Sequence, residues 1–182
     1  PDGKLLAIAR GGDVVILDAG SRSPVATLST EDRSLNALAW SPDGKRLAAA
    51  EGIPGVEGAI RVWTVSPDGE PQGEAAEWVG QSDSLYGIAF TRDGRSILTC
   101  GYDRLIQKWD TTTGKPTVPF VHHTAPVFGL SVSPDGKFLA SVAGDSTLKV
   151  WSVESAQRLA TFTESTKTLS AVTFSPKGDE IA

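Results

Sequence analysis

The chain has 182 residues, of which 40% are hydrophobic, so it is long enough to bury one sizeable core. It carries 17 Lys and Arg against 22 Asp and Glu, and this net charge of −5, without a basic cluster, argues against nucleic acid or an anionic membrane as the main partner. A single cysteine excludes an internal disulfide framework, and no apolar run approaches the roughly 18 residues that a membrane-spanning helix needs.

A short turn sequence recurs along the chain and divides it into units. Its copies are PDGK at 1–4, SPDGK at 41–45, TRDGR at 91–95, SPDGK at 133–137 and SPKGD at 175–179. Counted on the proline position, successive copies lie 41, 50, 42 and 42 residues apart. Pro fixes φ at the first central position of a type I turn, Asp can bond its own backbone, and Gly supplies the left-handed residue of a three-residue hairpin loop. Each copy is therefore predicted to join two antiparallel strands.

Short apolar segments of strand length flank these turns. The first unit gives strands at 5–9, 14–17 and 25–28 and lacks a first strand. Each of the next three units is predicted to supply four strands, which in the last of them are 127–132, 138–142, 148–153 and 158–162. A final first strand is expected at 169–174. Two insertions of loop composition, at 51–58 and 66–72, explain the step of 50 residues.

Four-stranded units that repeat about every 42 residues, without helical periodicity, predict a β-propeller. LAS at 139–141, GD at 144–145 and LKVW at 148–151 resemble the WD-repeat pattern, as do HH at 122–123, YD at 102–103 and KWD at 108–110. This resemblance to the WD-repeat (WD40) family covers the whole chain and implies an all-β fold, a partial propeller ring of four-stranded antiparallel blades. The array 1–182 divides into a partial blade at 1–30, full repeats at 31–80, 81–122 and 123–164, and a partial blade at 165–182.

Three arrangements of the two partial units stay open. They could pair into a fourth blade of a compact ring, or complete an eight-blade ring between two chains. The third arrangement, an open arc cut from a larger ring, is the one we expect. Unpaired strand edges in such an arc predict self-association.

The resemblance also implies a structural tetrad of His, Ser or Thr, Asp and Trp in each unit, in which buried polar groups satisfy one another. The fourth unit has His123, Ser141, Asp145 and Trp151, and the third has Gln81 in the His place with Thr99, Asp103 and Trp109. The second unit has Glu31, Ala49 and Glu57 with only Trp63 retained, and the first has Leu17 in place of Trp. We therefore expect the fourth unit to be the most rigid.

The same residues have alternative chemical interpretations that we weigh against this one. Ser141, His123 and Asp145 could be a hydrolase triad, but no nucleophile elbow surrounds Ser141. His122 and His123 could begin a metal site, but they are the only histidines and no clustered Cys or carboxylate completes it. Cys100, in an apolar strand, is expected to be a buried inert thiol. We expect no catalytic residue, no metal and no cofactor.

The positions that break the apolar pattern at the start of each first strand are the candidate partner-binding residues. By analogy with the WD family they open onto the narrow top face around the central channel, where partner peptides dock. They are Asn36, Tyr86, Phe128 and Ser170, with Ser34, Ser84 and Pro126 two residues before the first three and Tyr102 on a neighbouring turn. Tyr86, Phe128 and Tyr102 would be aromatic anchors. The alternative is that they only pack on adjacent loops.

These observations favour a non-catalytic scaffold that binds a protein or peptide partner, and neither nucleic acid nor a membrane, on its top face. One alternative is an enzyme with a propeller fold, which would need an acid–base or metal cluster that the sequence does not show. Another is an accessory domain of a larger protein whose chemistry lies outside this stretch. The sequence does not indicate a cellular compartment.

Overall fold

The computed structural model describes residues 2–10, 12–30, 33–117, 119–120 and 123–182, and these residues form fourteen β-strands and no helix. The strands build four antiparallel sheets in which each strand pairs with the next along the chain. The first sheet contains β1 (Leu5–Arg10), β2 (Asp13–Asp18) and β3 (Pro24–Ser29), and the second contains β4 (Ser34–Trp40), β5 (Arg46–Ile53), β6 (Glu57–Thr64) and β7 (Ala76–Gln81). The third contains β8 (Leu85–Phe90), β9 (Ser96–Gly101) and β10 (Ile106–Asp110), and the fourth β11 (Val127–Val132), β12 (Phe138–Ala143), β13 (Leu148–Ser152) and β14 (Arg158–Phe162).

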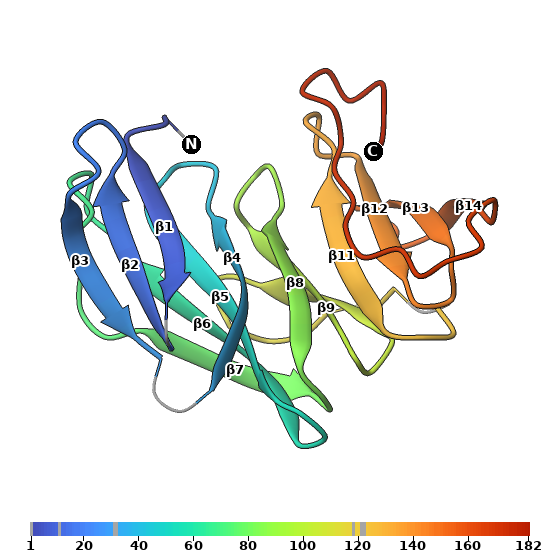
Figure 1. Cartoon of the computed structure of the whole chain (residues 1–182), viewed down its shortest axis with the longest axis horizontal. Coiled ribbons are helices and arrows are strands. Elements are labelled where there is room, and N and C mark those ends of the chain that lie inside the picture. Colours follow the sequence, from blue (N-terminus) through green and yellow to red (C-terminus); the bar gives the residue numbers. More distant parts are fainter. Residues whose placement is uncertain (1, 11, 31–32, 118, 121–122) are drawn as a thin grey trace.

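The four sheets stand side by side in an open arc (Figure 1). β4 lies beside β8 and β8 beside β11, so these three first strands form the inner side of the arc. The first sheet and the C-terminal segment lie at opposite ends of the arc, and the ring is not closed. The expected all-β fold, an incomplete propeller of antiparallel sheets, is confirmed.

The recurrent turns have the geometry that their sequence predicts. In the turn at 133–137, Gly136 has φ of 77°, and the Asp135 carboxylate accepts hydrogen bonds from Ser133 Oγ (2.6 Å) and the Lys137 backbone N–H (3.0 Å). These hydrogen bonds lower the pKa of Asp135. The turns at 41–45 and 91–95 repeat the same bonds. All the described turns of this type point to one edge of the arc, the upper edge in Figure 1, which we call the turn face.

The core lies between neighbouring sheets rather than within one. Alternate residues of a strand point to opposite faces, and each face carries apolar side chains that pack on the next sheet. The three interfaces each contain a buried cluster, and representative members are Ile16 with Leu47, Ala50 with Ile97, and Cys100 with Leu139. Each Å² of apolar surface buried at these interfaces contributes about 25 cal/mol, and this burial stabilises the stacking of the sheets.

Two predicted strands are wrong. Residues 169–174 lie along β11 but form only one bridge, Phe174 to Ile181, because only Ile181 and Ala182 lie opposite them as a second strand. The third unit also lacks a full fourth strand among the described residues, where only Pro116 and Phe120 bridge to β10. Pro116 and Pro119 have no N–H to donate, which interrupts a ladder at this edge.

Candidate interaction surface

The inner strands β4, β8 and β11 each contain one β-bulge, at the same position of the repeat. The residues that the bulges leave without a cross-strand partner are Asn36, Tyr86 and Phe128. Side chains of a strand alternate between the two faces of the sheet, and a bulge turns its extra side chain out of this pattern. Bulges are frequent beside binding sites. The bulges therefore explain why these three positions break the apolar pattern of the sequence.

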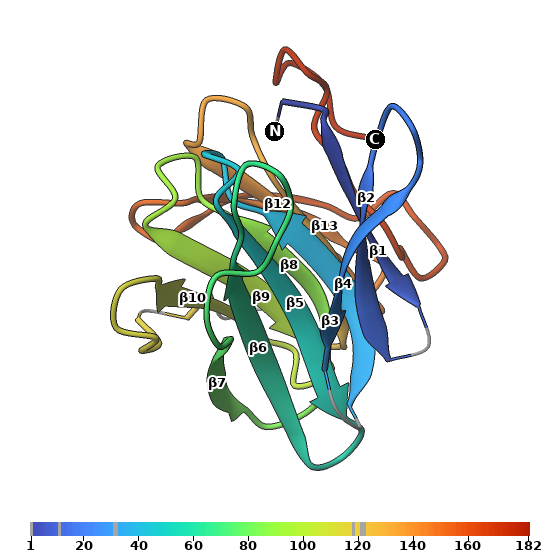
Figure 2. The same cartoon turned by 90° about the vertical axis from the view of Figure 1, so that its left-hand side faces the viewer.

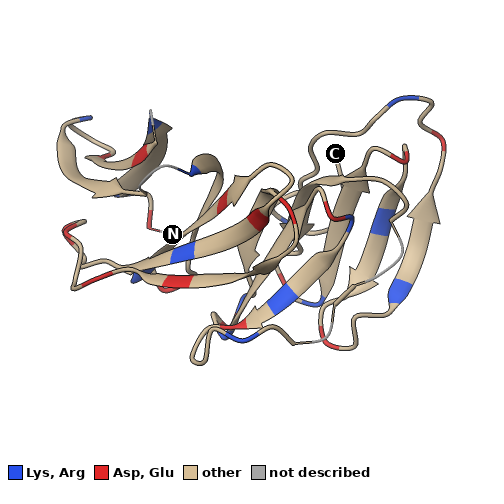
Figure 3. Ribbon diagram, turned by 90° about the horizontal axis from the view of Figure 1, so that it is seen from below, with Lys and Arg blue, Asp and Glu red and all other residues tan. Residues whose placement is uncertain are grey.

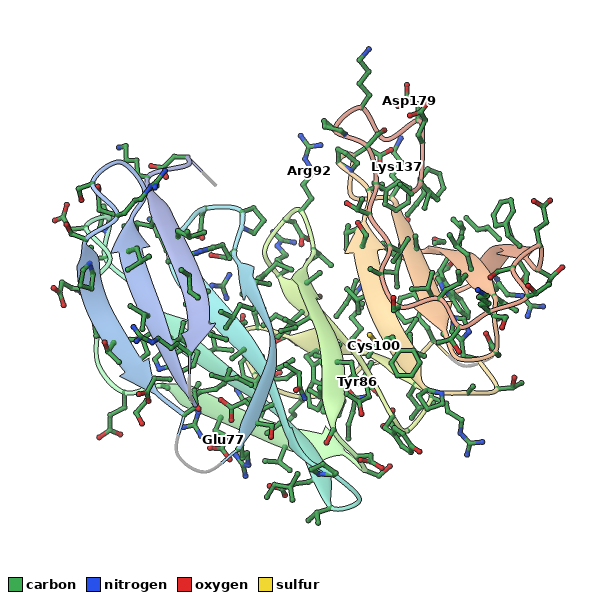
Figure 4. The ribbon with its side chains drawn as sticks, viewed as in Figure 1. Glu77, Tyr86, Arg92, Cys100, Lys137 and Asp179 are labelled. Carbon is green, nitrogen blue, oxygen red and sulfur yellow. The ribbon has the colours of Figure 1, made fainter. Side chains whose placement is uncertain are left out.

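The three bulged side chains lie in a row across neighbouring inner strands. The rings of Tyr86 and Phe128 have centroids 5.5 Å apart and an interplanar angle of 48°. Asn36 Nδ2 donates a hydrogen bond of 2.8 Å to the backbone oxygen of Leu85, which ties the first strand of the row to the second. Figure 4 shows Tyr86 at the end of β8 opposite to Arg92, so the row lies on the face opposite to the turn face. We call this opposite face the top face, and it points down in Figures 1 and 4.

Close packing behind the row fixes its spacing. A Cβ on Gly87 would lie 2.7 Å from Cys100 Sγ, and one on Gly129 would lie 3.3 Å from the Cα of Ala171. Real Cβ atoms essentially never approach to 2.7 Å, and at 3.3 Å the neighbour must shift by a few tenths of an ångström, so the packing favours small residues where the inner strands converge.

The other predicted partner-binding residues differ in accessibility. Tyr102 is 53% exposed, Ser34 and Ser170 are exposed, and Pro126 is half-buried. Ser84 is only 3% exposed, because it lies against Gly52 and Gly101, where a Cβ would contact it at 2.5 Å. The prediction that Ser84 contributes to an accessible surface is therefore wrong.

The β5–β6 hairpin adds two apolar side chains to the top face that the sequence interpretation missed. Its tip carries Ile53, 40% exposed, and Val56, 63% exposed, and it projects beyond the other hairpins of this face (Figures 1 and 2). Asp83 Oδ1 accepts hydrogen bonds from the backbone N–H groups of Gly55 (2.9 Å) and Ser84 (2.7 Å), which fixes the tip against the third sheet. The signal in the sequence was the pair of aliphatic residues inside the insertion at 51–58, which we interpreted only as loop.

The predicted tetrad of the fourth unit forms one continuous hydrogen-bond relay. Trp151 Nε1 donates to Ser141 Oγ (2.8 Å), Ser141 Oγ lies 2.8 Å from His123 Nε2, and His123 Nδ1 lies 3.0 Å from Asp145 Oδ2. Because Ser141 accepts from the indole, its own proton points to Nε2, so the His123 proton is on Nδ1 and faces Asp145. Burial lowers the pKa of His123, although the bond to Asp145 acts in the opposite direction. Burial alone would raise the pKa of Asp145, but hydrogen bonds from Thr147, Thr124 and His123 hold it well below its usual value.

The third unit builds the same relay with an amide in place of the imidazole. Trp109 Nε1 donates to Thr99 Oγ1 (2.8 Å), the Thr99 hydroxyl donates to Gln81 Oε1, and Gln81 Nε2 lies 3.2 Å from both carboxylate oxygens of Asp103. The amide has one acceptor and one donor at its two ends, as neutral imidazole does. The third and fourth sheets therefore carry the same pattern of partners.

The second sheet replaces the relay with a network of five charged side chains. Arg61 Nε lies 3.0 Å from Glu51 and Arg61 Nη2 lies 3.0 Å from Glu77, while Arg33 lies 2.6 Å from Glu77 and 2.5 Å from Glu57. Glu57, which we had placed at the Asp position of a degraded tetrad, thus binds an arginine. Glu51 is fully buried, and burial raises its pKa. Glu31, the expected counterpart of His123, lies outside the described residues.

None of these polar sets has the geometry of a hydrolase site. Ser141 is fully buried, and its hydroxyl is engaged by both Trp151 and His123. No group of three or more His, Cys, Asp or Glu side chains in the described ranges could hold a metal ion, and His122 lies outside those ranges. Cys100 is buried, and burial raises the pKa of its thiol, which disfavours the nucleophilic thiolate.

A family model decides the family. The model described as "WD domain, G-beta repeat" matches residues 22–64, 74–110 and 114–152. The chain belongs to the WD-repeat family. The third of these matches includes the full tetrad of the fourth unit, so the relay at Trp151 lies inside a WD repeat recognised by sequence.

Several curated WD-repeat proteins are similar to parts of the chain. The COMPASS component SWD3 of Saccharomyces cerevisiae is 30% identical over 115 residues, which are 63% of this chain and 34% of that protein. The TOPLESS-related protein 2 of Oryza sativa subsp. japonica is 31% identical over 144 residues, 68% of this chain and 12% of that protein. The F-box-like/WD repeat-containing protein TBL1X of Mus musculus is 28% identical over 96 residues, 52% of this chain and 16% of that protein. The chain thus spans about a third or less of these relatives. The described residues include no helix long and apolar enough to cross a membrane.

Proposed function

We propose that this WD-repeat chain is a non-catalytic interaction module that binds a peptide segment of a protein partner on its top face. The observation that carries the proposal is the row of bulged residues Asn36, Tyr86 and Phe128, whose two rings contact each other on adjacent inner strands. Tyr102 and the β5–β6 hairpin extend this surface with exposed apolar area. Large aromatic side chains dominate the energy of many interfaces, because they bury much area at little entropic cost.

The similar proteins support a partner that is protein. One relative is described as a component of COMPASS, and another combines WD repeats with an F-box-like region. Acidic and basic positions are interspersed over the ribbon (Figure 3), and a net charge of −5 leaves no excess of cations to bind phosphate backbones. We retain the proposal that neither nucleic acid nor a membrane is the main partner.

Selection from a library of random linear peptides tests this function. Peptides enriched on the chain should lose about tenfold or more in affinity when Tyr86→Ala and Phe128→Ala are combined, since removing interface anchors costs about 2 kcal/mol or more. Lys137→Ala, on the turn face, is the matched control and should leave the affinity unchanged. Thermal unfolding of each variant shows whether it is folded. Enriched peptides that bind the double variant as well as the original chain would refute the top face as the site.

The small share of each relative that the chain spans favours a second role. Since the chain spans between 12% and 34% of the three relatives above, we also propose that it serves as the accessory WD-repeat part of a larger protein with its chemistry elsewhere. The open arc supports the related proposal that the array 1–182, with partial units at 1–30 and 165–182, belongs to a larger propeller. Expression with the flanking sequence, followed by measurement of the mass and any catalytic activity, separates this role from an independent module.

A further inference from the structure

An arginine of the chain itself occupies the space between two neighbouring turns on the turn face. Arg46, the first residue of β5, reaches from the second sheet to the third. Its Nη2 donates a hydrogen bond of 2.7 Å to the backbone oxygen of Gly94, and its guanidinium carbon lies 5.5 Å from the centre of the Phe90 ring. Thr111 Oγ1 donates a second hydrogen bond, of 3.0 Å, to the same Gly94 oxygen.

The next pair of turns repeats this arrangement with different side chains, among which Arg92 replaces Pro42 and packs beside Gly136. Four residues after the proline position, Ser96 takes the place of Arg46, and its strand β9 lies against β11 of the fourth sheet as β5 lies against β8 of the third. One repeat of 42 residues further on, Gly136 corresponds to Gly94 and Val153 to Thr111. The Gly136 oxygen accepts no hydrogen bond from the residues that the structure describes. The acceptor of the arginine site is therefore repeated without either of its donors.

A groove of about 840 Å³ lies at this second site. Ser96, Gly136 and Val153 line it, and Phe138 and Leu159 add apolar surface that is 38% and 53% exposed. Between the first and second sheets, where Leu5 takes the Arg46 position, a groove of about 390 Å³ is found. The groove is thus larger where the side chain at this position is shorter.

The charges that line the groove cancel, so its net charge does not repel a further cation. Its cations are Arg92, Lys108 and Lys137, and its acids are Asp93, Asp135 and Glu154. Each cation already has a partner, since Arg92 donates to the Pro134 oxygen, Lys108 Nζ to the Val153 oxygen (3.3 Å), and Lys137 Nζ lies 3.9 Å from Asp135. Figure 4 shows Arg92 and Lys137 on neighbouring turns at the same edge of the arc.

We propose that this groove between the third and fourth sheets binds the arginine side chain of a partner protein, in the manner in which Arg46 fills the equivalent space of the second and third sheets. The guanidinium would donate to the Gly136 oxygen and to the groove carboxylates, and it would lie against Phe138. A planar guanidinium donates in several directions at once and stacks on rings, which an ammonium does not reproduce. This site lies on the turn face and is independent of the proposed peptide surface.

Titration of the whole chain with N-acetyl-arginine amide, followed by two-dimensional amide NMR, tests the site. We expect saturable shifts of the Ser96 and Gly136 signals, with a Kd at least about tenfold lower than for N-acetyl-lysine amide. Ser96→Arg should fill the groove from within and abolish the response. Arg46→Ser should open the equivalent space and create a new response at Gly94.

The outcomes of this titration are decisive in either direction. Equal binding of the arginine and lysine probes, or tighter binding of N-acetyl-glutamate amide, would overturn the proposal. So would an undiminished response in a Ser96→Arg variant whose remaining spectrum shows the native fold. If Ser96→Arg does not fold, the Arg46→Ser variant decides alone, since no new response at Gly94 would contradict the equivalence of the two spaces.

Discussion

Gln81 and His123 occupy the same place in two relays, and of these two side chains only His123 can titrate. Both groups present an acceptor to a hydroxyl and a donor to an aspartate. The amide keeps this polarity at every pH, whereas imidazole keeps it only while it is neutral. The Gln81 relay is therefore a control within the same chain, since its hydrogen bonds do not depend on the titration of an imidazole.

The first prediction is that His123 makes stability fall in mild acid. Because burial lowers its pKa in the folded state, the unfolded chain binds the proton more readily, so this contribution is present above the ordinary His pKa and is lost as the pH falls below it. The urea midpoint of the original chain should drop between pH 7.5 and 5.5 by more than that of His123→Gln. Gln81→His should steepen the drop. The raised pKa of Glu51 acts with the opposite sign but equally in all three chains. Parallel pH profiles would contradict the prediction.

The second prediction concerns the central hydroxyl of the third relay. Thr99→Val keeps the shape of a fully buried side chain but removes both the acceptor of Trp109 and the donor to Gln81. An unsatisfied buried polar group costs about 1–3 kcal/mol, so the free energy of unfolding should fall by about 2 kcal/mol or more. The exposed Thr112→Val is the control and should change stability by less than about 0.5 kcal/mol. A loss no larger than that of the control would show that water replaces the missing partners.

At the level of single residues, the sequence predicted some features and missed others for identifiable reasons. The turn at 133–137 and the relay partners of Trp151 follow from local residue chemistry at fixed spacing, and the structure brings those residues together. The charge network was missed because Arg33, which precedes β4, and Glu77 of β7 are 44 residues apart and become neighbours only when the second sheet has formed. The burial of Ser84 was missed because it depends on the glycines of two other strands.

Among the elements, the second sheet carries a network of charged side chains where the third and fourth sheets carry a relay. Its network holds three carboxylates and two guanidinium groups, and Glu51 Oε2 accepts no hydrogen bond among the described residues, although it lies 3.9 Å from Arg33 Nη1. Burying charge is expensive unless every group is paired. The neutral His123 of the fourth sheet has a partner at both ring nitrogens.

The third prediction follows from the pairing of Arg61 with Glu51 across β5 and β6. Arg61→Met should destabilise the chain by about 3–5 kcal/mol, since it leaves a fully buried carboxylate without its closest cation. Adding Glu51→Leu should recover most of this loss, because apolar replacement of a whole buried pair is often neutral. Denaturant unfolding of the two single variants and the double variant measures the coupling. Additive losses would show that the pair does not act as a unit.

The fourth prediction compares the first strands of the second and fourth sheets. We predict slower amide hydrogen exchange for residues 129–132 of β11 than for residues 37–40 of β4, because the fourth relay is satisfied and the second sheet carries the costly network. Exchange followed by NMR in the native state reports these local opening free energies residue by residue. Equal protection of the two strands would mean that the charge network stabilises its sheet as well as the tetrad does.

For the molecule as a whole, the two end sheets of the arc lack the neighbours that the inner sheets have. Leu6 and Ile8 of β1 are 50% and 41% exposed. The residues at the equivalent positions of the other sheets are all fully buried: Leu47, Ala49, Ile97, Thr99, Leu139 and Ser141. At the other end, Phe162 is 52% exposed, whereas Phe120 at the corresponding bridge of the third unit is 1% exposed and meets Trp151 edge to face at 5.9 Å.

The fifth prediction is that these end faces drive self-association of the chain. Each is an apolar face that elsewhere in the arc packs on another sheet, and β1 also offers an unpaired strand edge. Light scattering on a sizing column should show a mass that rises with protein concentration. The double substitution Leu6→Lys and Ile8→Lys should shift the mass toward the monomer, because burying two ammonium groups in the contact opposes it.

The matched control for self-association is Val56→Lys, which adds a charge at a side chain that is 63% exposed on the top-face hairpin and far from either end face (Figure 1). It should leave the mass unchanged. A monomer at every concentration would mean that the exposed apolar area at the ends is too small to overcome the entropy lost on association. An effect of Val56→Lys equal to that of the β1 substitutions would instead place the contact on the top face, and the peptide-binding surface would then be blocked in the associated state.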